Sequence, residues 1–309
     1  MKKTKQYRIN KLIYLLISLC LLSCKENTTT TFPFTYGKYG HIIIPVCIAD
    51  TVINFAFDTG ASLSSIDIRN KPSKLKLTDS CVEVSMLLNI MKKDKVKIAE
   101  NINIKFNKTV LANNVTFTVY DTIIENIDTV NLIGMNVIKQ FFWHFDFANK
   151  TVTISKSPLA IPKYSHTLSY SLSPYDSNIN MSKINDSIYI LNFDTGYTLN
   201  HEDSTKNIVA DTNVIIVYIA KKYENIKAFA NGLKRNDLTK YYNSYQIYFD
   251  SIKINKNWYK DKIIATYEIP VLPDFYDKKL IFTLNFFKQF EQMYIDTKEQ
   301  IIYLKPYEN

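Results

Sequence analysis

Two aspartates in matching local sequences are the residues best suited to carry chemistry in this chain. Asp58 lies in the motif Phe-Asp-Thr-Gly at 57–60, and Asp194 lies in a second copy of that motif at 193–196. Two carboxylates held close together share one proton, because ionising both is unfavourable. The neutral carboxyl can then polarise a carbonyl group while the ionised one takes a proton from a water molecule. The pair is therefore suited to the addition of water to a carbonyl carbon.

The similarity around the two aspartates extends in both directions along the chain. Upstream, residues 48–53 align with 184–189. Downstream, residues 135–141 align with 284–290, and Asn, Lys, Gln and Phe are identical in the two downstream segments. A repeat that holds at both ends of each copy predicts one structural unit that was built twice. We expect an N-terminal lobe at 36–158 and a C-terminal lobe at 165–306, with the aspartates in one site between them.

Composition and patterning predict that both units are built from β-strands. Alanine is scarce, whereas Ile, Tyr, Phe, Val and Thr, which favour strands, are abundant. The strands expected in the first unit are 41–48, 52–57, 82–88, 96–104, 115–120 and a closing hairpin at 145–154, with a short helix at 137–142. Those expected in the second unit are 214–219, 245–249, 262–267 and a hairpin at 293–304, with a helix that matches the first.

The N-terminus is typical of a targeting segment. Cationic residues precede an apolar stretch at 12–22, and the sequence Leu-Leu-Ser-Cys at 21–24 is similar to a bacterial lipobox. We predict a lipoprotein signal peptide at 1–24, lipidation of Cys24 and a polar tether at 25–35. An ordinary signal peptide and an uncleaved anchor are the alternatives. The predicted location is the cell envelope, by a lipid anchor on the periplasmic face of the inner or outer membrane or on the cell surface.

Charge does not indicate a nucleic-acid partner. The formal net charge is +9, and removal of the five cations in 1–23 leaves +4 on the mature chain, with no dense basic cluster. Four histidines are scattered, and no Cys or His spacing indicates a metal site, so no metal is expected. Cys47 and Cys81 remain in the mature chain, either as one disulfide or as small buried hydrophobic residues.

These motifs resemble a known enzyme family. Asp-Thr-Gly-Ala-Ser at 58–62, with Leu-Ile-Gly at 132–134 downstream, resembles the signature of retropepsin-like aspartic proteases, and its doubling resembles the pepsin-like enzymes with shorter lobes. The resemblance covers 32–157 and 165–304. It implies an all-β fold of two pseudo-two-fold related β-barrel lobes, each with one short helix. It also implies a monomeric endopeptidase that needs no cofactor and hydrolyses peptide or protein substrates.

The resemblance also implies roles for individual residues. Asp58 and Asp194 are the expected catalytic pair, and Thr59 and Thr195 are expected to brace their two loops by mutual hydrogen bonds. A hairpin at 84–96 is the candidate flap over the cleft. The glycines expected to permit tight turns or close packing are Gly60, Gly196 and Gly134.

The second unit departs from the family pattern in two places. Tyr197 stands where Ala61 stands in the first unit, and its phenol either fills the cleft or turns outward. Thr283 stands where Gly134 stands. Two functions therefore remain open, a membrane-anchored aspartic endopeptidase and an inactive protease-like lipoprotein that binds a peptide, glycan or protein partner.

Overall fold

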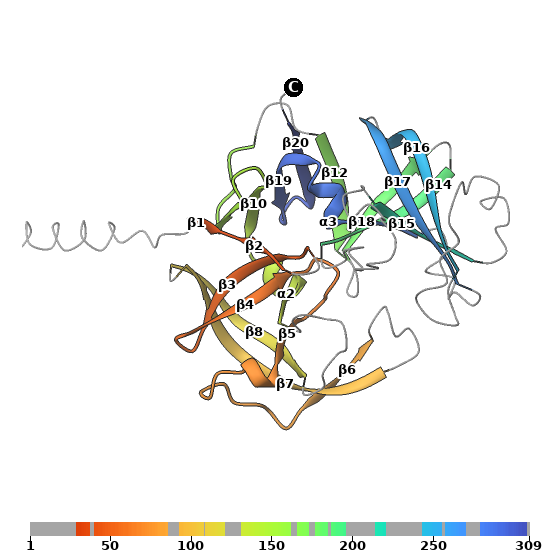
Figure 1. Cartoon of the computed structure of the whole chain (residues 1–309). Coiled ribbons are helices and arrows are strands. Elements are labelled where there is room, and N and C mark those ends of the chain that lie inside the picture. Colours follow the sequence, from red (N-terminus) through yellow and green to blue (C-terminus); the bar gives the residue numbers. More distant parts are fainter. Residues whose placement is uncertain are drawn as a thin grey trace, which may run out of the picture.

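The computed structural model consists mainly of β-strands, in agreement with the predicted all-β class (Figure 1). It describes residues 29–37, 40–85, 93–107, 109–120, 131–161, 166–172, 177–184, 187–195, 214–220, 243–254, 257–269 and 279–307. The predicted signal peptide, Cys24 and residues 25–28 lie outside the described residues. Within those ranges, no helix has the length and apolar character needed to cross a membrane.

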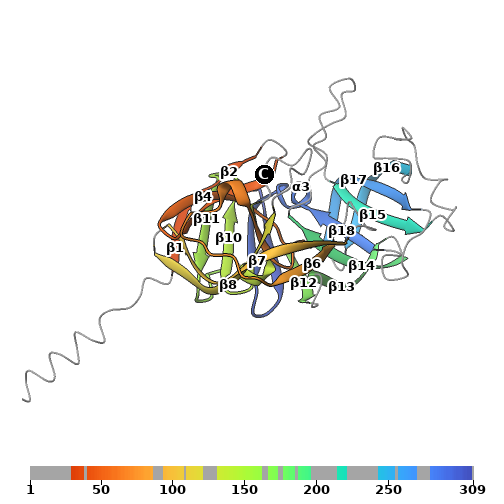
Figure 2. The same cartoon turned by 90° about the horizontal axis from the view of Figure 1, so that it is seen from below.

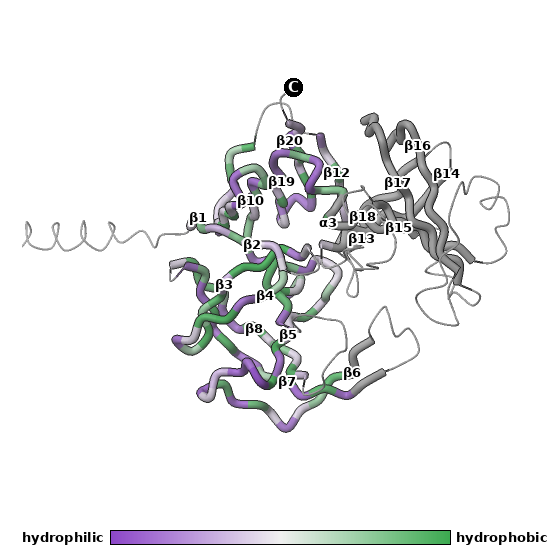
Figure 3. The backbone as a smooth tube through the Cα atoms, in the orientation of Figure 1, coloured by the Kyte–Doolittle hydropathy of each residue, from purple (hydrophilic) through white to green (hydrophobic). Residues whose placement is uncertain are grey.

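The strands of the first half of the chain, residues 29–155, fall where apolar residues alternate or cluster. They are β1 (Thr29–Pro33), β2 (Thr35–Tyr36), β3 (Ile42–Ile48), β4 (Thr51–Phe57), β5 (Ser64–Asp67), β6 (Cys81–Ser85), β7 (Lys93–Phe106), β8 (Val110–Tyr120), β9 (Leu132–Ile133), β10 (Phe142–Asp146) and β11 (Thr151–Ser155). In β3, every second residue is buried, as the two-residue period of a strand requires. Figure 3 shows β3 and β4 as a mainly hydrophobic part of the backbone.

The strands of the second half, residues 166–306, include all of those predicted and several that were not. They are β12 (His166–Leu172), β13 (Ser177–Ile184), β14 (Ser187–Asp194), β15 (Val214–Ala220), β16 (Asn243–Ile254), β17 (Asn257–Ile269), β18 (Lys279–Thr283), β19 (Phe290–Asp296) and β20 (Ile301–Pro306). The predicted strands at 245–249 and 262–267 are central parts of β16 and β17, which form one long hairpin.

Short helices follow β9 and β18. Helix α2 (Met135–Ile138) begins directly after Gly134, and α3 (Leu284–Phe287) follows Thr283. The prediction of a helix at 137–142 placed it too late, because Phe142 already belongs to β10. A 3-10 turn, η1 (Ile68–Asn70), was not predicted.

The eight-stranded sheet of the first half closes on itself. Its order is β2-β3-β4-β9-β5-β8-β7-β6, and an additional pairing joins β3 to β7. The strands from β3 to β7 therefore form a ring around an apolar interior. Phe55 and Phe117 meet inside it with ring centroids 5.9 Å apart, and both are fully buried.

The strand order of the first half recurs in the second. The order β3-β4-β9-β5-β8-β7 is matched by β13-β14-β18-β15-β17-β16. The register is the same as well, because Phe57 lies opposite Ile133 in a parallel pair and the matching Phe193 lies opposite Phe282 in a parallel pair. The strand that leads to each aspartate is thus paired in the same way with the strand that leads to each short helix.

Six strands from both halves form a continuous antiparallel region in the order β1-β11-β10-β19-β20-β12. Figure 2 shows β1, β11 and β10 side by side. The prediction of a tether at 25–35 was wrong for this part, because Thr29–Pro33 is the strand β1 and Phe32 is buried opposite Val152. The tether interpretation failed because the partner of β1 is β11, which lies more than 100 positions later in the sequence and cannot be seen from the local pattern.

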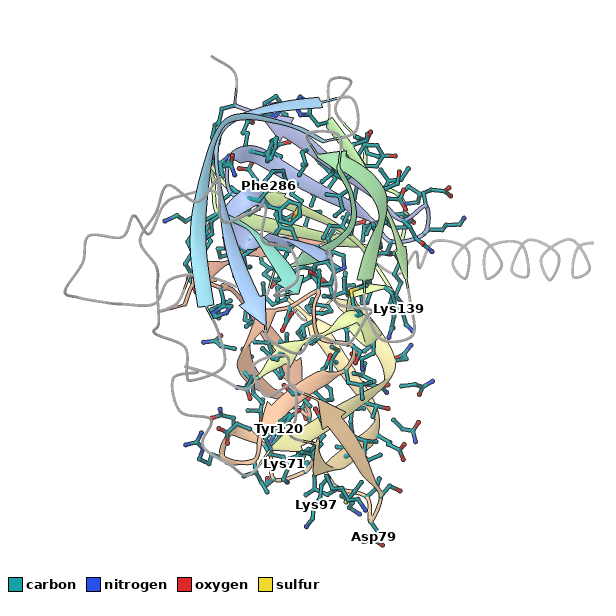
Figure 4. The ribbon with its side chains drawn as sticks, turned by 90° about the vertical axis from the view of Figure 1, so that its right-hand side faces the viewer. Lys71, Asp79, Lys97, Tyr120, Lys139 and Phe286 are labelled. Atoms are coloured by element: carbon teal, nitrogen blue, oxygen red, sulfur yellow. The ribbon has the colours of Figure 1, made fainter. Side chains whose placement is uncertain are left out.

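Aromatic side chains fill the interior between this sheet and the closed ring. Trp143 is fully buried, packs on Phe57 with centroids 4.8 Å apart, and donates a hydrogen bond from Nε1 to the Ile138 carbonyl at 2.8 Å. Figure 4 shows Phe286 of α3 among the strands, whereas Lys139 lies at the periphery. These aromatic residues form core contacts that hold the strands of the site in position.

The two cysteines do not form a disulfide. Cys47 lies opposite Lys105 of β7, and Cys81 lies opposite Lys97 of the same strand. Positions 97 and 105 of an extended strand are roughly 26 Å apart along its axis, whereas disulfide-bonded residues have Cα atoms within about 7 Å. Both are free, Cys47 half-buried and Cys81 exposed, so neither prediction for Cys81 was right.

A stacked pair of rings joins the two halves at the centre of the six strands. His144 in β10 lies opposite Tyr294 in β19, and the rings are 4.0 Å apart and inclined by 3°. Burial lowers the pKa of His144, an effect that the nearby charge of Asp146 and the amide of Gln292 oppose. The Nε2 atom of His144 is buried without a hydrogen-bond partner. Protonation of this ring is therefore unfavourable in the folded protein.

Replacing His144 with Phe should flatten the dependence of stability on pH. The unfolded chain takes up a proton near pH 6.5, so the contribution of neutral His144 is fully present above that pH and is lost as the pH falls through the lower folded pKa. Urea unfolding at several pH values from about 7 to about 5 measures this slope. Tyr294→Phe keeps His144 and should keep the slope; equal slopes in wild type and His144→Phe would contradict the prediction.

Candidate active site

Asp58 lies at the end of β4, where a short loop begins. Its backbone N–H donates to the Ile133 carbonyl at 3.0 Å, which continues the pairing between β4 and β9. Its Oδ1 atom accepts hydrogen bonds from the N–H groups of Gly60 at 2.8 Å and Ala61 at 3.1 Å. Backbone donors of this kind favour the ionised carboxylate. The half-buried carboxylate is thus fixed by its own loop, residues 58–63, which we call the Asp58 loop.

Thr59 and Thr195 link the two halves directly after the two aspartates. The N–H of Thr59 donates to Thr195 Oγ1 at 3.1 Å, and the N–H of Thr195 donates to Thr59 Oγ1 at 3.0 Å. Thr195 Oγ1 also donates to the Phe57 carbonyl at 3.0 Å. Both threonines are buried. These reciprocal bonds bring the two Phe-Asp-Thr segments into contact, although they are far apart in sequence.

Gly134 packs against the backbone of the Asp58 loop. A Cβ atom at this position would lie 2.7 Å from the Ala61 carbonyl oxygen and 2.7 Å from the carbonyl of Leu63. Real Cβ atoms do not approach so closely, and the obstructing atoms belong to the backbone. Any larger residue would therefore push the loop away from β9.

Asp194 is the last residue of β14 and pairs in parallel with Thr283 of β18. It directly precedes Thr195, so the threonine bonds bring its backbone close to the Asp58 loop. The structure describes the backbone of Asp194 and Thr283 but not their side chains, and Gly196 and Tyr197 lie outside the described residues. The structure thus brings together Asp58, Thr59, Gly60, Gly134 and Thr195 and the backbone of Asp194.

The candidate flap is part of a β-hairpin. Strands β6 and β7 are antiparallel, and Val82 lies opposite Val96 while Ser85 lies opposite Lys93. The tip of the hairpin, residues 86–92, lies outside the described residues. The described residues on either side of these positions pair as a hairpin requires, and the role of 84–96 as a flap stays a prediction.

Three polar side chains near the site, two of them buried and one half-buried, were not given a role from the sequence. Ser64 and Asn136 hydrogen-bond to each other, and Asn131 accepts from the Asp67 N–H at 2.9 Å and donates to the Asn54 carbonyl at 3.2 Å. The available signal was that Asn136 is one of the four residues identical in both copies of the segment after β9. Among the described residues, no three His, Cys, Asp or Glu side chains gather as a metal ion would require.

No protein-family model matches the chain, and no curated protein is significantly similar to it.

Removing either threonine hydroxyl should weaken the link between the halves. Thr59→Val or Thr195→Val leaves a buried N–H without its acceptor, at a cost of about 1–3 kcal/mol in the free energy of unfolding. The double variant should lose less than the sum, because the first substitution already separates the loops.

The matched control is the hydroxyl pair of Thr31 and Thr153, whose oxygens are 2.8 Å apart at an exposed site. Substitution of Thr31 by Val should change the unfolding free energy by less than about 0.5 kcal/mol. Strictly additive losses for Thr59 and Thr195, or losses as small as the control, would show that the reciprocal bonds do not couple the halves.

Replacing Gly134 with Ala should destabilise the protein by about 1–3 kcal/mol, because the added methyl group meets fixed backbone atoms. Gly37→Ala is the matched control, since its Cβ would meet the end of the Ile43 side chain at 3.3 Å, which can move aside. Chemical unfolding of both variants measures the difference, and equal stability of the two would contradict the packing argument.

Proposed function

We propose that this protein is an aspartic endopeptidase in which Asp58 and Asp194 activate one water molecule between two lobes. The observation that carries the proposal is the pair of reciprocal hydrogen bonds between Thr59 and Thr195, directly after the two aspartates. A site assembled in this way needs one matching segment from each half.

The proposed architecture is a pair of pseudo-two-fold related lobes, similar to those of the retropepsin-like and pepsin-like enzymes. Supporting it are the recurring strand order and the equal parallel registers of β4–β9 and β14–β18. The pairing of β10 with β19 also supports it. Asp146 and Asp296 each accept the N–H three residues later in matching turns, so His144 and Tyr294, two residues before them, are matching positions that lie opposite each other. A two-fold axis through the His144–Tyr294 pair would produce this symmetric register.

In the proposed reaction, Asp58 is the ionised carboxylate. The N–H groups of Gly60 and Ala61 favour its charge, which suits it to take a proton from water. The oxygen of that water forms a bond to the peptide carbonyl carbon, while protonated Asp194 gives its proton to the carbonyl oxygen. The C–N bond then breaks as the proton held by Asp58 passes to the amine nitrogen, while one hydroxyl of the tetrahedral intermediate returns its proton to Asp194 and becomes the carbonyl of the new carboxyl group. No covalent intermediate with the protein forms.

One observation favours a second function, an inactive lipoprotein that binds a peptide, glycan or protein partner. Thr283 lies opposite Asp194, at the position that Gly134 occupies in the first half. A side chain at Gly134 would collide with the Asp58 loop, so a threonine at the matching position is not compatible with packing of the same closeness. Tyr197 is a further departure in the same half.

The proposed location is the cell envelope, with a lipid on Cys24 as the membrane anchor. Strand β1 begins at Thr29, so the chain between Cys24 and the folded body spans at most roughly 18 Å. A lipidated protein of this design would work close to the membrane surface. We expect a monomer, because one chain supplies both aspartates.

The test is cleavage of a diverse peptide mixture by residues 25–309, from acidic to neutral pH, with products identified by mass spectrometry. Asp58→Asn and Asp194→Asn should each lower the cleavage rate by at least about a thousandfold, because each removes one of two groups that act together.

Asp296→Asn is the matched control, because Asp296 Oδ1 accepts the Lys298 and Glu299 N–H groups in a hairpin turn. It should cleave at the wild-type rate. Cleavage that survives Asp194→Asn would contradict the shared pair. A folded protein that cleaves nothing at any pH would favour the binding function.

A further inference from the structure

A partly buried polar cluster, with Ser64 buried and Asn136 half-buried, lies against the Asp58 loop. Asn136 Oδ1 accepts from both the N–H and the hydroxyl of Ser64, each at 2.8 Å, and its Nδ2 donates to the Thr116 carbonyl at 2.8 Å. The Ser64 hydroxyl in turn accepts the N–H of Gly134 at 3.0 Å. One amide side chain therefore ties together the start of β5, the strand β8 and the start of α2.

The first residues of α2 hold the Asp58 loop directly. The Met135 N–H donates to the Ala61 carbonyl at 2.7 Å, and the Asn136 N–H donates to the Ser62 carbonyl at 3.2 Å. Ala61 is the residue whose own N–H donates to Asp58 Oδ1. Hydrogen bonds thus connect α2 to the carboxylate of Asp58 through Ala61, whose carbonyl accepts from Met135 and whose N–H donates to Asp58.

We propose that Asn136 is a positioning residue that fixes the Asp58 loop against β5, β8 and α2. Its side chain orients the start of α2, and the N–H groups exposed there hold the loop that orients the Asp58 carboxylate. The bearing of Asn136 on catalysis rests on the proposed function, whereas its hold on the loop does not.

The amide of Asn136 suits this role chemically. It offers an acceptor for two donors of Ser64 and a donor for the Thr116 carbonyl, and a carboxylate or an apolar side chain cannot satisfy all three groups. Ser64 is buried and Asn136 is half-buried, and polar groups shielded from water are costly to leave without partners, so the complete cluster holds its members in place. The second copy of the segment keeps this residue type as Asn285, whereas Met135 is replaced by Leu284.

The experiment compares amide hydrogen exchange and steady-state kinetics in three variants of the full chain in detergent. In Asn136→Ala, amide exchange in residues 58–63 should be about ten- to a hundredfold faster than in wild type. The loop would be held less firmly by α2, so its N–H groups would separate more often from their acceptors. The kcat for peptide cleavage should fall at least about tenfold, with KM within about twofold, since misplacement of a catalytic group affects the chemical step.

Ser64→Ala removes the hydroxyl bonds to Asn136 Oδ1 and to the Gly134 N–H but keeps the bond from the Ser64 N–H to Asn136. It should show smaller changes in the same direction, so it decides the matter if Asn136→Ala does not fold. Asn107→Ala is the structural control: it removes a 3.0 Å hydrogen bond to Thr30 Oγ1 and should leave exchange in 58–63 unchanged.

If amide exchange in residues 58–63 is no faster in Asn136→Ala and Ser64→Ala than in the Asn107→Ala control, the proposal is overturned. Faster exchange with an unchanged kcat would reduce Asn136 to a structural residue and would also overturn its positioning role. If wild type cleaves no peptide, the proposed function fails, yet the exchange experiment still decides whether Asn136 holds the loop.

Discussion

The reciprocal hydrogen bonds between Thr59 and Thr195 are the contact on which the candidate site depends. Asp58 directly follows β4 and Asp194 is the last residue of β14, so each aspartate belongs to a different half and neither half alone can assemble the pair. The residue after each aspartate, Thr59 or Thr195, bonds to its counterpart in the other half, and these bonds fix the ends of β4 and β14 relative to each other. In a buried setting an unpaired N–H is costly, which favours the joined arrangement strongly over a separated one.

Each half must present its aspartate rigidly for this contact to be useful. In the first half, that rigidity comes from the close approach of Gly134 to the Asp58 loop and from the polar cluster around Asn136. The aromatic interior supports the strand that leads to Asp58, because Trp143 packs on Phe57 of β4. The six-stranded antiparallel region then joins the two halves a second time, through His144 and Tyr294.

The repeat made most of this arrangement predictable from the sequence. Strands, the turns after Asp58 and the matching helices follow from apolar patterning and from the identity of the two copies. Strand β1 was missed because Phe32 is its one large inward-facing residue and its partner β11 is remote in sequence. The role of Asn136 was missed for a similar reason, since its partners Ser64 and Thr116 come together only when the sheet closes.

The most direct test of the shared site is calorimetric titration with a statine-type inhibitor, whose hydroxyl imitates the water that adds to the peptide carbonyl. The account predicts one inhibitor bound per chain, with binding lost in Asp58→Asn and in Asp194→Asn and weakened in Thr195→Val. Binding that persists in Asp194→Asn, or no binding by the folded wild-type protein, would contradict a site built jointly by the two halves.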